Sequence, residues 1–241
     1  MLGHSGDHIT IDWGYLYLAS ADAVFHEADG LSVRATGGAK LMIGYDDVAS
    51  INYFGTPAKA YYARNGRTLP EALADFDARR DALLQRCAAF DDTLDEMASA
   101  RGGDDYRLIC AAGYRHCIAA HKLIADEHGD MVFLSKENDS NGCIGTVDVS
   151  YPSIPLFLKF NPEFVRAMCR PVLRFASLPV WHYDFAPHDV GRYPQVLGQV
   201  YGVIRGGNDV KNGDVYPPSY LYPATVCWST ISRAGTRSTP S

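Results

Sequence analysis

The sequence of 241 residues predicts a mainly helical fold that begins with a short β-rich region. Two long stretches after Thr68 carry apolar residues at three- and four-residue steps, which is the period of an amphipathic helix. The first 55 residues instead contain short alternations of apolar and polar residues, as strands do. The composition, 47% hydrophobic and 21% charged, is that of a globular protein with a core.

The N-terminal region is expected to contain short strands. Apolar and polar residues alternate at residues 9–11, 16–18 and 41–43. Gly37 and Gly38 interrupt this pattern, and Gly55-Thr56-Pro57 marks a turn. We therefore expect residues 1–55 to form a short β-rich entry region that leads into a helical domain.

Two consecutive long helices are expected next. Thr68 and Glu71 have the spacing of a capping box, and Pro70 stands in the first turn, so a helix should begin there and run to about Met97. Gly102-Gly103 should end it, and a second helix should run from residue 104 to near Gly129. Two long helices joined by a tight glycine turn predict an antiparallel helical hairpin.

Helices and polar loops are expected to alternate through residue 212. Residues 131–134 should be extended, residues 135–146 should form a loop, and further helices should begin near Pro155 and at Asn161-Pro162. Residues 213–241 form a Ser/Thr-rich segment without an amphipathic period, in which Asp214 is the only acid. Our hypothesis is an irregular tail produced by a frameshift near residue 212; an intact reading frame on resequencing would refute it.

The composition also excludes several classes of partner. A net charge of −6 disfavours binding to nucleic acid and to anionic membrane surfaces. No apolar run approaches the roughly 20 residues that span a bilayer, and the N-terminus lacks a signal-peptide pattern. The six cysteines show no CxxC spacing, which favours a reducing compartment slightly without fixing the location. Zinc and cofactor motifs are absent, so neither a metal nor a cofactor is expected.

The polar loop after residue 134 is the first candidate for a site. It contains Lys136, Glu137, Asn138 and Asp148, a density of charge that suits a polar substrate. A carboxylic acid near apolar walls can donate a proton while a carboxylate in a wetter place activates water, and Glu137 and Asp148 are our pair. The alternative is a surface loop in which Asn, Asp and Ser side chains bond to their own backbone.

A second candidate lies between Trp181 and Pro194. His188 beside Asp189 is suited to proton transfer, Arg192 to holding a carboxylate, and Trp181 to stacking on a ligand. Adjacent side chains often diverge, however, which leaves a structural role open for each of them. The absence of GxSxG, GxxxxGK[ST] and GxGxxG removes the main support for a serine hydrolase, a P-loop enzyme and a dinucleotide enzyme.

Several segments between about residues 8 and 202 together resemble the glutaminase A family. The resemblance is carried by Asp12-Trp13-Gly14-Tyr15-Leu16-Tyr17-Leu18, Tyr45-Asp46-Asp47, Ala119-Ala120-His121-Lys122-Leu123, residues 135–152, and Phe185-Ala186-Pro187-His188-Asp189-Val190-Gly191 with Tyr193-Pro194. It implies a barrel of six helical hairpins, an (α/α)6 toroid, and hydrolysis of the side-chain amide of glutamine. This chain departs from the family pattern at Asp139, where an aromatic residue is more usual, and family members extend further at both ends.

The resemblance therefore adds three expectations. The fold should be an incomplete toroid over residues 56–212. The chain should belong to a hydrolase that uses Glu137, Asp148 and Asp189 as acids or bases, with Lys136, Asn138, Trp181, His188 and Arg192 lining the pocket for a small polar molecule or a carbohydrate. A glycoside hydrolase remains an alternative, since related toroids are used by glycosidases. A further alternative is an inactive fragment or a domain that only binds.

Overall fold

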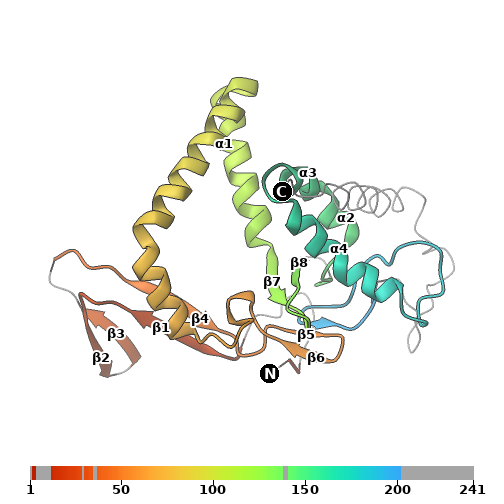
Figure 1. Cartoon of the computed structure of the whole chain (residues 1–241), viewed down its shortest axis with the longest axis horizontal. Coiled ribbons are helices and arrows are strands. Elements are labelled where there is room, and N and C mark those ends of the chain that lie inside the picture. Colours follow the sequence, from red (N-terminus) through yellow and green to blue (C-terminus); the bar gives the residue numbers. More distant parts are fainter. Residues whose placement is uncertain (1, 4–11, 29, 35–36, 138–140, 202–241) are drawn as a thin grey trace, which may run out of the picture.

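A computed structural model describes residues 2–3, 12–28, 30–34, 37–137 and 141–201 (Figure 1). Its strands are β1 (Tyr15–Ala19), β2 (Val24–Ala28), β3 (Gly30–Arg34), β4 (Met42–Asp46), β5 (Ile51–Tyr53), β6 (Thr56–Ala58), β7 (His121–Ala125), β8 (Met131–Ser135) and β9 (Gln195–Val196). Its helices are η1 (Tyr61–Ala63), α1 (Leu69–Ala119), α2 (Val147–Ser150), η2 (Tyr151–Ser153), α3 (Ile154–Phe160) and α4 (Pro162–Ala176).

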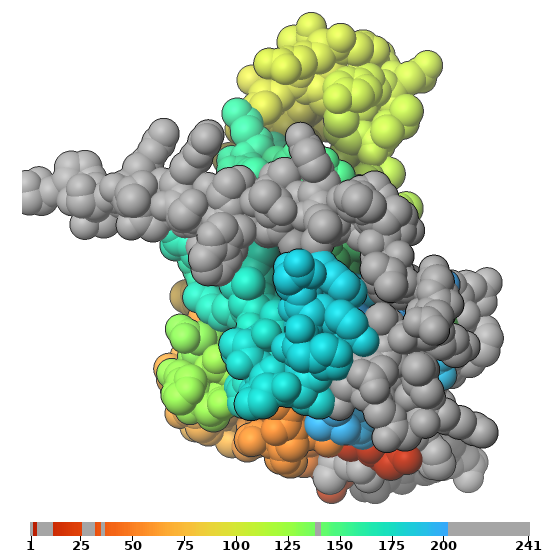
Figure 2. Space-filling model, turned by 90° about the vertical axis from the view of Figure 1, so that its right-hand side faces the viewer, coloured from red at the N-terminus to blue at the C-terminus, as the bar shows by residue number. Residues whose placement is uncertain are grey.

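Helix α1 consists of two arms that meet at Gly103. The side chain of Thr68 accepts a hydrogen bond from the Glu71 amide, and the Glu71 carboxylate accepts one from the Thr68 amide, as the capping box predicts. Gly103 has φ 73° and ψ −166°, which interrupts the helix and turns the chain back. Figure 1 shows the arms converging on one apex, and Figure 2 shows that apex projecting beyond the body.

The second arm ends earlier than the sequence pattern predicted. The helix stops at Ala119, and β7 pairs antiparallel with β8 in the register Leu123↔Phe133. The expected continuation of the helix from residue 120 to near Gly129 was therefore wrong. The reason is that the two apolar runs flank a turn in which the Asp126 carboxylate accepts hydrogen bonds from the His128 and Asp130 amides, both at 2.9 Å.

Strand β8 is apolar on both faces because it separates two cores. Val132 and Leu134 belong to a core shared with β5, Ile144, Val172, Phe175, Trp181, Val190 and Val196. Phe133 instead joins a core formed with α3 and α4 through Phe157, Val165 and Met168. Side chains alternate between the faces of a strand, so β8 contributes to both.

The small sheets bring distant parts of the chain together. β1 pairs with β4, β2 pairs with β3, and the third sheet has the order β6-β5-β9, with β9 parallel to β5. The predicted alternations at residues 16–18 and 41–43 fall in or beside β1 and β4. The alternation at residues 9–11 and the tail over residues 213–241, with its proposed frameshift, lie outside the described residues.

The expected mainly helical toroid was wrong for the part of the chain that the structure describes. Several small sheets accompany the helices, and α1 is a single hairpin rather than part of a ring of hairpins. The physical reason is that the apolar runs at β5, β7 and β8 pair as strands and supply much of the core. Among the described residues, no helix is long and apolar enough to cross a membrane.

Candidate functional site

The two acid-bearing loops predicted from the sequence lie against each other. The Ile144 amide donates to the Gly191 carbonyl at 2.9 Å, and the Val190 amide donates to the Ile144 carbonyl at 3.0 Å. At one end of this ladder the Val147 amide donates to the His188 carbonyl at 2.8 Å. These bonds fix the loop that follows β8 against the loop that precedes β9.

Asp189 is completely buried and holds its own loop together. One carboxylate oxygen accepts hydrogen bonds from the amides of Gly191 and Val200, both at 3.0 Å. The other accepts from the Tyr201 amide at 3.1 Å and lies 3.0 Å from Nδ1 of His188. With both oxygens satisfied and no exposed surface, the geometry favours an orienting role for Asp189. Direct acid or base chemistry by this residue stays a prediction.

His188 connects Asp189 with Asp148. Nε2 of the ring lies 3.6 Å from Oδ1 of Asp148, and its Nδ1 faces Asp189. The His188 side chain is 8% exposed, whereas that of Asp148 is 39% exposed. Asp148 stands in the first turn of α2, where the helix dipole favours a negative charge. The three side chains thus form an array whose solvent-facing member is Asp148.

Glu137 contacts Thr146, the residue that immediately precedes α2. The hydroxyl of Thr146 donates to its carboxylate at 2.7 Å, and Thr146 itself is completely buried. Burial, followed by the negative charges of Asp189 and Glu137, raises the pKa of the Cys143 thiol far above its usual value. The Glu137 amide also donates to the Cys143 carbonyl at 2.9 Å. Glu137 is thus tied to Thr146 and Cys143, in the same loop that leads to Asp148, and Asp148 faces His188 and Asp189.

The predicted binding residues have different environments. Nζ of Lys136 lies 5.3 Å from the centre of the Tyr193 ring, a cation–π contact. Arg192 is exposed beside Cys143, with which it forms a β-bridge. Trp181 is 5% exposed, packs in the core and donates its indole N–H to the Phe185 carbonyl at 2.7 Å. This burial favours a structural role for Trp181, and Asn138 lies outside the described residues.

The sequence reasoning singled out neither Asp47 nor Lys122, although both occur in the motifs of the family resemblance. Their side chains form an ion pair between the β4–β5 connection and β7. Asp47 is only 3% exposed, and the Ser50 hydroxyl lies 2.7 Å from its carboxylate. The sequence signal was the acidic pair Asp46-Asp47, but nothing local indicates a partner that is 75 residues away.

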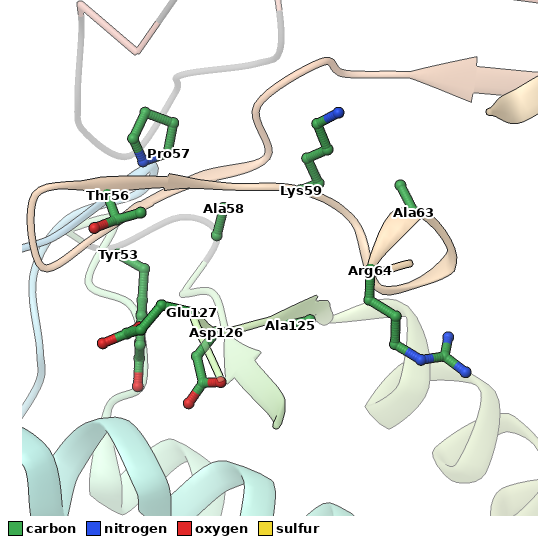
Figure 3. A pocket seen from close by; sticks show the side chains of 10 residues that line it. All are labelled: Tyr53, Thr56, Pro57, Ala58, Lys59, Ala63, Arg64, Ala125, Asp126 and Glu127. Carbon is green, nitrogen blue, oxygen red and sulfur yellow. The ribbon is translucent and has the colours of Figure 1, made fainter. Parts of the chain in front are cut away.

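Hollows in the surface occur elsewhere. One of about 250 Å³ lies beside β6 and is lined by Lys59, Arg64, Asp126 and Glu127 among others. Figure 3 shows the ammonium group of Lys59 directed away from the two acids. Hollows of about 590 and 650 Å³ flank α1. None of these three hollows is lined by a residue predicted for the candidate site.

Among the residues that the structure describes, no three His, Cys, Asp or Glu side chains are grouped as a metal site would require.

Comparisons with known proteins identify related sequences. Residues 103–208 match the model of the glutaminase A six helical-hairpin domain, and residues 26–97 match a domain of unknown function, DUF5127. Glutaminase A of Aspergillus oryzae is 29% identical over 181 residues, which covers 71% of this chain and 26% of that protein. A probable glutaminase of Arthroderma benhamiae is 28% identical over 114 residues, which covers 47% of this chain and 13% of that protein. The chain thus spans about a quarter or less of these relatives, and no solved structure matches it.

Proposed function

Because the chain belongs to the glutaminase A family, we propose that it carries part of a hydrolytic site that cleaves the side-chain amide of glutamine or of a similar small polar substrate. The observation that supports this proposal most strongly is the array Asp148–His188–Asp189 beside Glu137. A paired set of carboxylates can supply both the acid and the base that amide hydrolysis requires.

Asp148 is proposed as the base. Its side chain is the member of the array most exposed to solvent, whereas its Oδ1 atom, which faces His188, is buried, so water and substrate would approach its other carboxylate oxygen. His188 lies behind it at 3.6 Å and is itself oriented by Asp189. Nε2 of His188 and Oδ1 of Asp148 lie 3.6 Å apart without a hydrogen bond, so a small movement of either side chain would let the imidazole share a proton that Asp148 takes from water. An oriented histidine is suited to this role, and here it lies behind the base, Asp148.

Glu137 is proposed as the acid. Water attacks the amide carbon and gives one proton to Asp148, and the C–N bond then breaks as Glu137 protonates the leaving nitrogen, which departs as ammonia. Solvent afterwards returns a proton from Asp148 to Glu137, so the site is regenerated. The hydrogen bond from Thr146 at 2.7 Å holds Glu137 in a fixed position for this step.

The cations at the edge of the site are suited to the rest of the substrate. Arg192 is exposed next to Cys143, and Lys136 immediately precedes Glu137. A guanidinium group binds carboxylates in a planar, two-point geometry. We propose that these residues hold the carboxylate of an amino-acid substrate while its side-chain amide faces the two acids.

The test is an assay of ammonia and of reducing sugar, run side by side on the purified chain with L-glutamine and with oligosaccharides. Ammonia release that is lost in Asp148→Asn and kept in Asp184→Asn supports the proposal, because Asp184 is an exposed acid in the His188 loop. Release of sugar without ammonia would replace it with a glycosidase function. If neither product forms, the hydrolytic proposal fails for this chain and a binding role is favoured.

A further inference from the structure

The connection between β4 and β5 is held in a strained conformation. Val48 has φ 58°, in the left-handed region that a β-branched residue rarely adopts. Strain of this kind persists only where the surroundings enforce it, and it clusters at functional sites. The surroundings of the connection between β4 and β5 must therefore enforce the conformation of Val48.

The residues of the N-terminal motif enforce this conformation. The indole N–H of Trp13 lies 2.7 Å from the Asp47 carbonyl and 3.0 Å from that of Ala49. Gly14 permits the close approach of the chains, because a Cβ at this position would lie 2.3 Å from the Asp46 carbonyl oxygen. The motif thus fixes the backbone on which Asp47 stands.

The Asp47 carboxylate points into the body of the molecule. It is 3% exposed, receives a hydrogen bond from the Ser50 hydroxyl at 2.7 Å, and forms an ion pair with Lys122. Placing a carboxylate in such a buried position costs solvation energy, which the paired ammonium offsets. A buried ion pair is weak evidence of a role in stability, so its position relative to the candidate site matters more.

The β7–β8 pairing links this ion pair to the candidate site. Lys122 is paired with Leu134, and Lys136 follows two residues later, so the pleat places both lysines on the same face. Lys136 extends over the ring of Tyr193 on that face. Burial, with a smaller contribution from the negative charge of Asp47, raises the pKa of Tyr193 to about 12.

We infer that Asp47 is a positioning residue for the candidate site: through its ion pair with Lys122 it fixes the face of β7 and β8 on which Lys136, next to Glu137, packs against Tyr193. The Asp47 carboxylate does not touch the substrate. It acts through Lys122, and its effect on turnover rests on the proposed function. The position of Lys136, in contrast, is a property of the fold that can be measured without any activity.

The experiment compares Asp47→Asn with Ser50→Ala in the full chain. Both variants weaken the same loop, but Asp47→Asn alone removes the charge that pairs with Lys122. The NMR signal of the Lys136 ε-methylene group is assigned by its loss in Lys136→Arg. Because this group lies over the Tyr193 ring, its chemical shift reports on the ring current. In Asp47→Asn we expect the chemical shift of this signal to move toward its value in the unfolded chain, and in Ser50→Ala we expect it to stay unchanged. The KM for L-glutamine should rise about tenfold in Asp47→Asn, the equivalent of one lost polar contact, with a smaller change in kcat.

Asp47→Asn leaves Lys122 unpaired and can impair folding, so the double variant Asp47→Asn/Lys122→Gln is measured as well. The same displacement of the Lys136 signal in the folded double variant supports the inference, and restoration in Asp47→Glu strengthens it. A Lys136 signal at its wild-type position in both variants would overturn the inference and leave Asp47 with a purely structural role. Absence of ammonia release by the wild-type chain would instead defeat the proposed function, while the NMR comparison would still decide the role of Asp47.

Discussion

Replacing Asp189 with Asn should destabilise the fold strongly, although the change removes no side-chain volume. In the native structure one oxygen accepts from the amides of Gly191 and Val200, and the other from Tyr201, with His188 Nδ1 at 3.0 Å. Asn can keep one carbonyl oxygen toward the first two amides. Its NH₂ group must then face the Tyr201 amide and the His188 ring.

The size of the effect follows from these contacts. Loss of a hydrogen bond to a charged group costs about 1.5–3 kcal/mol, and a buried donor left without an acceptor costs about 1–3 kcal/mol more. We therefore expect Asp189→Asn to lower the free energy of unfolding by roughly 3–5 kcal/mol. Because Asp189 is completely buried, solvent cannot replace the lost bonds without local opening.

Urea-induced unfolding, followed by the fluorescence of the buried Trp181, measures this difference. Asp184→Asn is the matched control, since Asp184 lies exposed in the same loop, and should change stability by less than about 0.5 kcal/mol. If Asp189→Asn is also within about 0.5 kcal/mol of the wild type, then the carboxylate does not organise the loop and the reasoning about its contacts is refuted.

Three other outcomes are expected. Burial lowers the pKa of His121 below its usual value of 6.5, so the unfolded chain binds more protons and stability should fall as the pH drops below about 6.5; this loss should be smaller in His121→Gln, as measured by thermal unfolding across pH. Gly191→Ala should destabilise the chain by at least about 2 kcal/mol in the urea assay, since its Cβ would lie 1.9 Å from the Gln195 carbonyl oxygen and φ is 144°; a smaller effect would show that the loop can move. Cys143 should resist alkylation in the native chain while exposed Cys87 reacts, because burial raises the pKa of the Cys143 thiol; equal labelling detected by mass spectrometry would contradict the burial of this residue.

Local signals in the sequence predicted local structure well. The capping box at Thr68 and the break at Gly103 depend on neighbouring residues alone, and both are present. Strand β7 could not be recognised in the same way, because its apolar residues continue the helical spacing of the second arm. Its pairing with β8 decides its conformation, and pairing is a contact between separate segments. The incomplete toroid expected over residues 56–212 was wrong, because the described residues supply much of their core with strands whose pairing partners are distant in the sequence.

In the candidate site, too, the sequence predicted which residues matter locally but not the contacts between separate segments. The density of acids after β8 indicated Glu137 and Asp148, and His188 beside Asp189 indicated an oriented imidazole. The sequence could not show that the His188 ring would face Asp148, since this contact depends on the backbone ladder between the two loops. It also gave no sign that Asp189 would be saturated by amides or that Asp47 would pair with Lys122.

The most direct test of the account is a double-mutant cycle on ammonia release from L-glutamine, with Glu137→Gln, Asp148→Asn and the combined variant. If the two acids act as one site, each single variant should lose at least about a hundredfold in turnover. The combined variant should then be about as slow as the slower single variant, because residues that act as a unit are not additive. Near-normal turnover in either single variant, or losses that multiply in the combined variant, would contradict a single site built from these two loops.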